Sequence, residues 1–140
     1  MVVENMQVNI DKNIQIYKAI SSIEINDIVK ECCEKVKAVY KDNKIYNRFR
    51  ICLHEMISNA VEHGNHHDMG KYININIQLT KEKITIMVED QGDGFEWKDY
   101  KYEFECNESY RGRGLKIIKH YCDNIAFNEK GNLIIASISV

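Results

Sequence analysis

A strict alternation of apolar and polar residues over Ile73–Leu79 is the feature that most narrows the possible folds. Branched apolar side chains stand at 73, 75, 77 and 79, and amide side chains stand between them. The same alternation returns over Ile84–Val88 after a short charged stretch, Lys81–Lys83. Successive side chains of a strand point to opposite faces, so each run has one apolar face. The two runs predict a β-hairpin whose apolar face is covered by a second layer.

Helical spacing of apolar residues predicts two helices before this hairpin. Ser21 followed by Glu24 resembles a capping box, in which the two residues satisfy free N–H groups at a helix start. The first helix then carries apolar residues at 25, 28, 29, 32, 36 and 39. The second begins near Asn43 or Lys44 and ends near Gly64, because glycine is a common C-terminal stop.

The remaining segments predict a third helix and further strands. Leu115–Tyr121 has helical spacing, and Asn124–Val140 is typical of a closing hairpin that turns near residues 130 and 131. A polar, aromatic loop is predicted from residue 91 to residue 113. The first dozen residues alternate weakly and could form an edge strand (Met6, Val8 and Ile10).

These elements predict an α+β protein. Helices followed by mostly antiparallel strands are typical of a two-layer α/β sandwich, with a mostly antiparallel mixed sheet covered on one face by helices. The length of 140 residues is common for one core, and the chain has no linker or repeat. We therefore expect residues 1–140 to form a single domain.

Composition argues against several classes of protein. A formal net charge of −2 gives no electrostatic reason to expect a nucleic acid partner. The sequence has no apolar run of 18 residues and no basic leader, so we expect a soluble cytoplasmic protein without a membrane partner. Five cysteines without a Cys-x-x-Cys pair indicate reduced thiols rather than disulfides or a zinc site.

Glu55 and Asn59 lie four residues apart on the second predicted helix, so their side chains emerge from one face. A carboxylate beside a carboxamide suits a site that needs one proton acceptor and one neutral oxygen ligand for a hard cation such as Mg²⁺. The alternative is a polar helix edge that faces solvent. Taken alone, these two residues favour that alternative.

Asp90 follows the strand Ile84–Glu89 and is itself followed by Gly92 and Gly94. A carboxylate at a strand end can accept a hydrogen bond from the amino group of adenine, where guanine offers an oxygen. The two glycines let the backbone turn tightly and approach a base closely. An ordinary acidic turn is the alternative, since Asp-Gly pairs are common in loops.

Two arginines and two glycines, Arg111–Gly114, stand directly before the third predicted helix. Free N–H groups at a helix start bind anions, and arginine adds charge-assisted donors for phosphate oxygens. The segment lacks the Gly-Lys-Ser/Thr ending of a Walker loop. The alternative is a basic loop with helix-breaking glycines.

The three segments in this order resemble the GHKL (histidine-kinase-like) ATPase superfamily. The motifs are Glu-x-x-x-Asn-Ala-x-x-His-Gly from Glu55, Asp-x-Gly-x-Gly-Phe from Asp90, and Arg-Gly-Arg-Gly-Leu from Arg111. The resemblance covers roughly residues 20 to 140. Within the superfamily, the short chain is similar to the bacterial anti-sigma factor serine/threonine kinases of the RsbW/SpoIIAB type.

The resemblance implies a role for each motif. Glu55 would be the general base, Asn59 the Mg²⁺ ligand, and His63 a further residue of the ATP site. Asp90 would hold the adenine amino group, with the glycines at 92 and 94 closing over the base. A lid of about residues 97–113 would cover the nucleotide, anchored at the phosphates by Gly112, Arg113 and Gly114. Arg111 and Leu115 would also belong to the nucleotide-binding residues.

The resemblance also implies a function, an ATP- and Mg²⁺-dependent kinase of a partner protein. The expected substrate is an anti-sigma factor antagonist with a STAS fold, the expected second partner is a sigma factor, and a homodimer is expected. One alternative is a non-catalytic, nucleotide-gated binding module. Another is an ATPase domain that works with a separate histidine-kinase-like partner. Glu55 favours the enzyme, because a pure binding module needs no base.

The chain departs from the family pattern in three places. Lys116 follows the last motif, where many relatives carry a small or apolar residue. Asn132 occupies the stretch in which many relatives place a threonine near adenine, so that contact is in doubt. The lid is rich in aromatic and acidic residues, which marks it as a candidate contact surface (Tyr100, Tyr102, Phe104 and Glu105).

Overall fold

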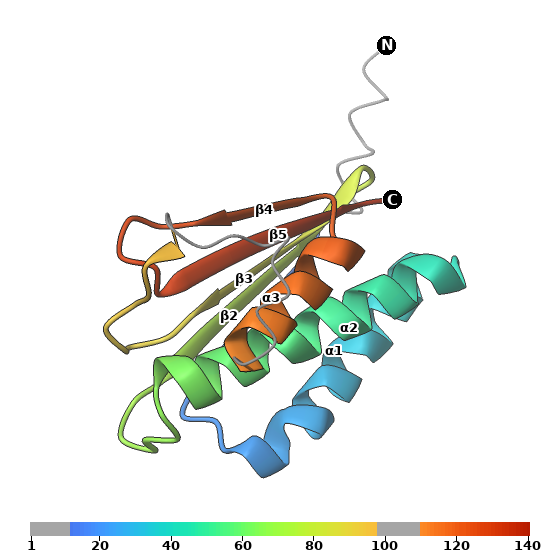
Figure 1. Cartoon of the computed structure of the whole chain (residues 1–140). Helices are drawn as coiled ribbons and strands as arrows, with labels where there is room; N and C mark the ends of the chain where they lie inside the picture. The colour runs from blue at the N-terminus through green and yellow to red at the C-terminus, as the bar shows by residue number, and fades with distance from the viewer. Residues whose placement is uncertain (1–11, 98–109) are drawn as a thin grey trace, which may run out of the picture.

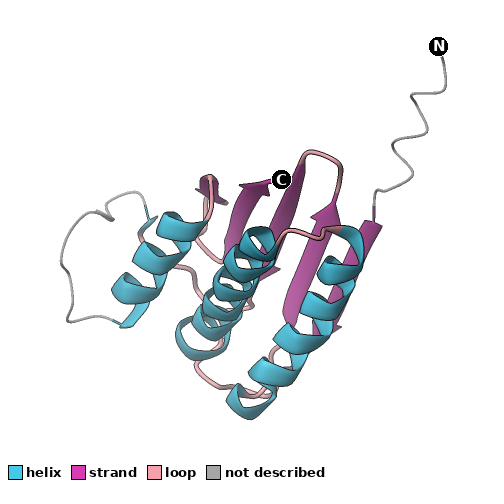
Figure 2. Ribbon diagram, turned by 90° about the vertical axis from the view of Figure 1, so that its right-hand side faces the viewer, coloured by secondary structure: helices cyan, strands magenta, loops and turns pink. Residues whose placement is uncertain are grey.

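Three helices cover one face of a five-stranded sheet (Figure 1). The computed structural model describes residues 12–97 and 110–140, and for residues 110–112 only the backbone. Its main elements are β1 (Lys12–Lys18), α1 (Ile25–Val39), α2 (Asn43–Asn59), β2 (Ile73–Leu79), β3 (Lys83–Glu89), α3 (Tyr110–Tyr121), β4 (Asn124–Phe127) and β5 (Leu133–Ser139). Figure 2 shows the helices as one layer against the sheet, so the predicted two-layer α+β sandwich is confirmed.

The strand order is β1-β2-β3-β5-β4, and each pair of neighbouring strands is antiparallel. Among the described strands the sheet is therefore antiparallel throughout, without the parallel pair that a mixed sheet would contain. The predicted hairpins are confirmed as β2–β3 and β4–β5. The edge strands are β1, which begins at Lys12, and β4. The residues that predicted an edge strand lie outside the described residues (Met6, Val8 and Ile10).

The capping box predicted ahead of α1 is present. The Ser21 N–H and the Ser21 hydroxyl both donate to the Glu24 carboxylate, over 3.0 Å and 3.1 Å. A short 3₁₀ turn over Ser22–Glu24 separates this cap from α1. The six buried residues of α1 are apolar or cysteine, which confirms the predicted helical face (Ile25, Ile28, Val29, Cys32, Cys33 and Val36).

Helix α2 ends in a widened turn that the sequence did not predict. It starts after Asp42, whose side chain accepts a hydrogen bond from the Lys44 N–H over 2.8 Å. After Asn59 the chain continues into a single π turn over Ala60–Gly64, closed by the Asn65 N–H donating to the Ala60 carbonyl oxygen over 2.8 Å. The helical segment thus ends at Gly64 as predicted. Single π turns of this kind are frequent at functional sites.

Helix α3 begins at Tyr110, earlier than the predicted start at Leu115. The prediction that Arg111–Gly114 is a loop ahead of the helix is therefore wrong, because these residues form its first turn. Glycine is less favourable than alanine in a helix by about 1 kcal/mol, which made a loop the natural expectation. The reason for the difference is the close packing of Gly114 on α2, which is described below.

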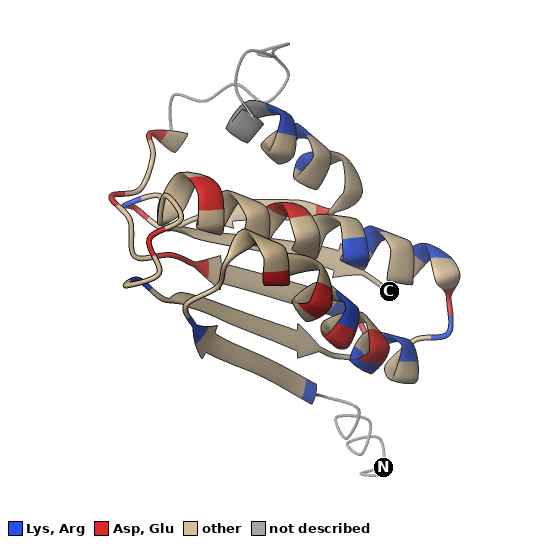
Figure 3. Ribbon diagram, turned by 90° about the horizontal axis from the view of Figure 1, so that it is seen from below, with Lys and Arg blue, Asp and Glu red and all other residues tan. Residues whose placement is uncertain are grey.

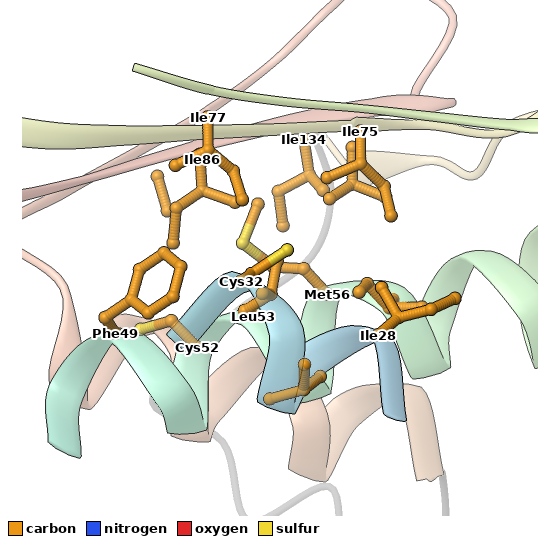
Figure 4. Close-up of a cluster of buried hydrophobic side chains, with 14 of the residues drawn as sticks. Ile28, Cys32, Phe49, Cys52, Leu53, Met56, Ile75, Ile77, Ile86 and Ile134 are labelled. Atoms are coloured by element: carbon orange, nitrogen blue, oxygen red, sulfur yellow. The ribbon is translucent and has the colours of Figure 1, made fainter. Parts of the chain in front are cut away.

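The hydrophobic core lies between the helices and the inner face of the sheet. In Figure 4, Phe49 and Met56 of α2 point toward the isoleucines of β2 and β3. Five residues of α2 are buried, and full burial of each such side chain stabilises the fold by about 1.5–3 kcal/mol. Because α2 also carries Glu55 and Asn59, packing of the core fixes where these two side chains lie.

Charged residues avoid the interior of the sheet. Figure 3 shows them on the helices and at strand ends, and the charged strand residues are the first or last of their strands (Lys12, Lys18, Lys83 and Glu89). The outward side chains of β2 are uncharged amides, as the alternation predicted.

The described cysteines are buried and form no disulfide (Cys32, Cys33, Cys52 and Cys122). Burial raises the pKa of Cys52 to about 12, which keeps its thiol protonated and unreactive. Among the described residues, none of the helices combines the length and the apolar composition that crossing a membrane requires.

Candidate functional site

Glu55 and Asn59 of α2 line an outer cavity of about 290 Å³ between α2 and α3. Its lining is mostly polar and includes a cation from α3 (His54, Glu55, Ser58, Asn59, Glu62, His63, Arg113, Gly114 and Ile117). Burial is the main cause that raises the pKa of Glu55, whose side chain is only 28% exposed. His54, 3.9 Å away, acts in the opposite direction, and Glu62 adds to the rise. The cavity therefore holds a carboxylate that is more basic than usual, together with an arginine.

Gly114 brings the start of α3 directly over Glu55 and Asn59. A Cβ at this position would lie 3.1 Å from Glu55 Oε1 and 3.2 Å from Asn59 Oδ1. Both distances are a few tenths of an ångström shorter than ordinary van der Waals contact, so glycine allows the closest approach of the two helices. This contact unites two of the three predicted motifs.

Asp90 and two glycines form a tight stack where β3 ends. Asp90 is 9% exposed, and its Oδ1 accepts a hydrogen bond from the Gly92 N–H over 2.8 Å. A Cβ at Gly64 would overlap the Asp90 carboxylate, and a Cβ at Gly92 would overlap the carbonyl oxygen of Gly64. The end of the α2 segment and the Asp-Gly loop can therefore meet only because both glycines lack side chains.

The Asp-Gly loop also packs on the turn between β4 and β5. Gly94 and Gly131 have positive φ angles of 86° and 85°, which favour glycine. A Cβ at Gly94 would overlap the carbonyl oxygen of Lys130, and one at Gly131 would overlap that of Phe95. Gly92 and Gly94 thus make close backbone packing, rather than lining the cavity that Asp90 faces.

An inner cavity runs from Asn59 to Asp90 and is mostly apolar. Its walls combine side chains of α2, α3 and the sheet (Met56, Asn59, Ala60, Val88, Asp90, Phe95, Leu115, Phe127, Gly131, Asn132 and Ile134). Its volume of about 20 Å³ is room for about one water molecule, so a planar ring could enter only if an aromatic wall moved. An apolar slot with a few fixed polar groups is the usual form of a small-molecule site.

Two aromatic rings line the inner cavity, those of Phe95 and Phe127, and a third ring packs on one of them. The Phe95 and Phe127 rings meet edge to face at 5.3 Å, and Trp97 stacks on Phe127 at 5.5 Å. Asn59 lines both cavities, so the apolar inner cavity and the polar outer one meet at this residue. Its buried Nδ2 has no hydrogen-bond partner among the described residues.

The structure thus brings most of the predicted site residues into one place. The outer cavity receives Glu55, Asn59, His63, Arg113 and Gly114, and the inner cavity receives Asn59, Asp90 and Leu115. The backbone of Arg111 and Gly112 lies in the first turn of α3, but the side-chain environment at these positions is outside what the structure describes. The predicted lid of about residues 97–113 begins at Trp97, which is described, and ends in the first turn of α3, while residues 98–109 lie outside the described residues.

Two residues that join the motifs were not identified from the sequence. The buried side chain of Asn65 accepts from the Gln91 N–H over 2.8 Å and donates to the Tyr72 carbonyl oxygen over 3.1 Å. It ties the end of the α2 segment to the Asp-Gly loop. Asn128 organises the β4–β5 turn in a similar way. Both act through contacts with residues distant in the chain or with a turn backbone, which no spacing pattern reveals.

Two comparisons with known proteins bear on this site. A family model described as "Histidine kinase-like ATPase domain" matches residues 23–138. The chain is also similar to the "Signal transduction histidine-protein kinase/phosphatase DegS" of Bacillus subtilis (strain 168), with 26% identity over 76 residues. That match covers 54% of this chain and 19% of DegS, so the chain matches about a fifth of that relative's length.

Proposed function

Because the chain belongs to the histidine kinase-like ATPase domain family, we propose that it is an ATP-dependent protein kinase. The proposed reaction transfers the γ-phosphate of ATP, bound with Mg²⁺, to a serine or threonine hydroxyl of a partner protein. The proposed substrate is an anti-sigma factor antagonist with a STAS fold, and the proposed regulatory role is sequestration of a sigma factor. The fold and the ATPase-domain family are established by the match over residues 23–138.

The two cavities, which share Asn59, support one orientation of the nucleotide. Asp90 at the inner end supplies a hydrogen-bond acceptor for the adenine amino group, and Arg113 at the outer end supplies a cation for phosphate oxygens. Asn59 lies between them with a buried amide nitrogen that lacks a partner among the described residues, which indicates a polar group missing from this point. Asn59 would hold the cation through its amide oxygen. When bound, Mg·ATP supplies the phosphoryl group and the neutralisation of its charge.

Glu55 carries the proposal that the protein is a kinase rather than a binding module. It stands at the outer cavity next to Arg113 and Gly114, where a partner hydroxyl could reach the phosphates. Partial burial raises its pKa, which brings the carboxylate closer to the basicity of an effective general base at neutral pH. Its role would be to accept the proton from the attacking hydroxyl.

The decisive experiment is phosphorylation with radiolabelled ATP. The protein is incubated with candidate STAS-domain partners, and the labelled residue is identified in the partner. We expect acid-stable phosphoserine or phosphothreonine with wild-type protein and none with Glu55→Gln, while both proteins bind ATP. Nucleotide binding without transfer to any partner would replace the kinase proposal with that of a nucleotide-gated binding module.

The similarity to DegS favours a second candidate function. In that case the chain would act as an ATPase domain that phosphorylates histidine on a separate histidine-kinase-like partner. Phosphohistidine is lost in acid and retained in base, whereas phosphoserine behaves in the opposite way. The same labelling experiment, with the product divided between acid and base treatment, therefore separates the two candidates.

A further inference from the structure

A chain of side-chain hydrogen bonds connects the β4–β5 turn to Asp90. The Asn128 Nδ2 donates to Asn132 Oδ1 over 2.7 Å, and the Asn132 Nδ2 donates to the Asp90 carbonyl oxygen over 2.8 Å. In the backbone, the Asp90 N–H donates to the Asn132 carbonyl oxygen over 2.9 Å. Asn132 therefore binds the peptide groups on both sides of the Asp90 Cα.

Backbone N–H groups at the turn determine the donor-to-acceptor direction of this chain of hydrogen bonds. The Asn128 Oδ1 accepts hydrogen bonds from the N–H groups of Gly131, Asn132 and Leu133, over 2.8, 3.1 and 3.2 Å. A flipped Asn128 amide would place NH₂ against three donors, so only the observed orientation is compatible. Asn128 then presents its NH₂ group to Asn132. Asn132 must in turn present its oxygen to Asn128 and its NH₂ group to Asp90.

This arrangement leaves the Asn132 amide engaged at both ends. Its oxygen accepts from Asn128, and its nitrogen donates to Asp90, although Asn132 lines the inner cavity beside Asp90. The Asp90 carboxylate is held separately, by the Gly92 N–H on Oδ1. Selection of a base in this cavity thus depends on Asp90, whose backbone Asn132 holds.

We propose that Asn128 and Asn132 are positioning residues that hold Asp90 in place and thereby determine selectivity for adenine, without themselves binding the base through their amides. The selectivity part rests on the proposed binding of ATP. The claim that Asn128 and Asn132 hold Asp90 concerns the protein without nucleotide, and it is tested in a separate experiment. The proposal also gives Asn132 a role at the place where many relatives have a threonine near adenine. Asn132 would hold Asp90 there and would not contact the base.

Two isosteric substitutions cut the hydrogen-bond chain at different links. Asn132→Asp keeps the acceptor for Asn128 but replaces the NH₂ group that faces the Asp90 carbonyl oxygen. Asn128→Asp keeps the acceptor for the three backbone N–H groups but removes the donor to Asn132. Asn13→Asp, on the exposed side of edge strand β1, is the control for the added charge. Thermal melting shows that each variant is folded, and Asn128→Asp carries the test if Asn132→Asp does not fold.

Selectivity is measured by titration with ATP and with inosine triphosphate, which carries an oxygen in place of the adenine amino group. The reporter is fluorescence of Trp97, the only tryptophan of the chain, which stacks on Phe127 of the inner cavity. We expect the ratio of the two affinities to fall about tenfold or more in Asn132→Asp, less in Asn128→Asp, and not at all in the control. In an Asp90→Asn background, Asn132→Asp should change the ratio no further.

Amide hydrogen exchange without nucleotide tests the positioning directly. We expect faster exchange at Asp90 and Gly92 in Asn132→Asp than in wild type or the control. Faster exchange with an unchanged affinity ratio would overturn the role in selectivity and leave a purely structural one. Unchanged exchange would overturn the positioning itself. A wild-type protein that binds neither nucleotide would overturn the proposed function and the selectivity with it, while exchange still decides whether Asn132 holds Asp90.

Discussion

Substitution of Gly114 by alanine should separate nucleotide binding from folding. Alanine is favoured over glycine within a helix by about 1 kcal/mol, which stabilises α3. The added Cβ would lie 3.1 Å from Glu55 Oε1 and 3.2 Å from Asn59 Oδ1, and forced overpacking costs about 1–3 kcal/mol. The cost is at the low end because the partly exposed Glu55 side chain can move aside. We therefore expect the free energy of unfolding to change by less than about 1 kcal/mol, or about 4 °C in melting temperature.

The added Cβ of Gly114→Ala should also weaken nucleotide binding strongly, because it displaces two side chains of the site. Asn59 and Glu55 must both move by a few tenths of an ångström, away from the positions that the proposed cation and hydroxyl require. We expect affinity for Mg·ATP to fall about tenfold or more, which corresponds to 1.4 kcal/mol. Any phosphoryl transfer should fall by at least the same factor, because misplacement of reacting groups is costly.

Calorimetric titration with Mg·ATP and thermal melting measure the two effects on Gly114→Ala. Gly70→Ala is a matched control, because its Cβ would lie 3.2 Å from Asp68 Oδ1 in an exposed loop outside both cavities. The control should bind nucleotide as wild type does. If Gly114→Ala also binds and transfers as wild type does, the contact between α3 and the two α2 side chains has no part in the site.

Three further substitutions test single groups. Burial raises the pKa of Glu55, so its ionisation lowers stability as pH rises through the folded-state value. Glu55→Gln should therefore be at least as stable as wild type at pH 7, with the difference vanishing below about pH 4 in denaturant titrations. Asp90→Asn should reduce the preference for ATP over GTP about tenfold or more, measured by competition, since hydrogen bonds to charged groups contribute about 1.5–3 kcal/mol. The Ser139 N–H and then Arg48 lower the pKa of Asp123, so its stabilisation is complete above about pH 4 and is lost in acid. The gap in unfolding free energy between wild type and Asp123→Asn should shrink as pH falls, and a gap constant from pH 7 to pH 2 would contradict this.

The elements that depend on local pattern were predictable from the sequence. The alternation over Ile73–Leu79 fixes a strand because one face must be buried, and Ser21 with Glu24 marks a helix start through a short-range exchange of hydrogen bonds. The grouping of Glu55, Asn59 and Asp90 followed from the order of three motifs. Each motif alone was compatible with an ordinary surface.

What could not be predicted depends on contacts between distant segments. The helical start at Tyr110 contradicts the local preference of two glycines and is explained by packing of Gly114 against α2. Likewise, the role of Asn132 depends on hydrogen bonds with Asn128 and with Asp90, and Asp90 directly follows a different strand, β3. Propensity describes a residue and its neighbours in sequence, so it carries no information about such partners.

The stack of Gly64, Asp90 and Gly92 joins the end of the α2 segment to the loop that follows β3. The inner cavity also needs walls from α3 and from the β4–β5 turn, so neither half of the chain alone would form it. Recognition of the nucleotide and completion of the tertiary structure should then be a single cooperative event. Saturating ATP, acting only on the finished fold, would protect the whole molecule against heat rather than one of its loops.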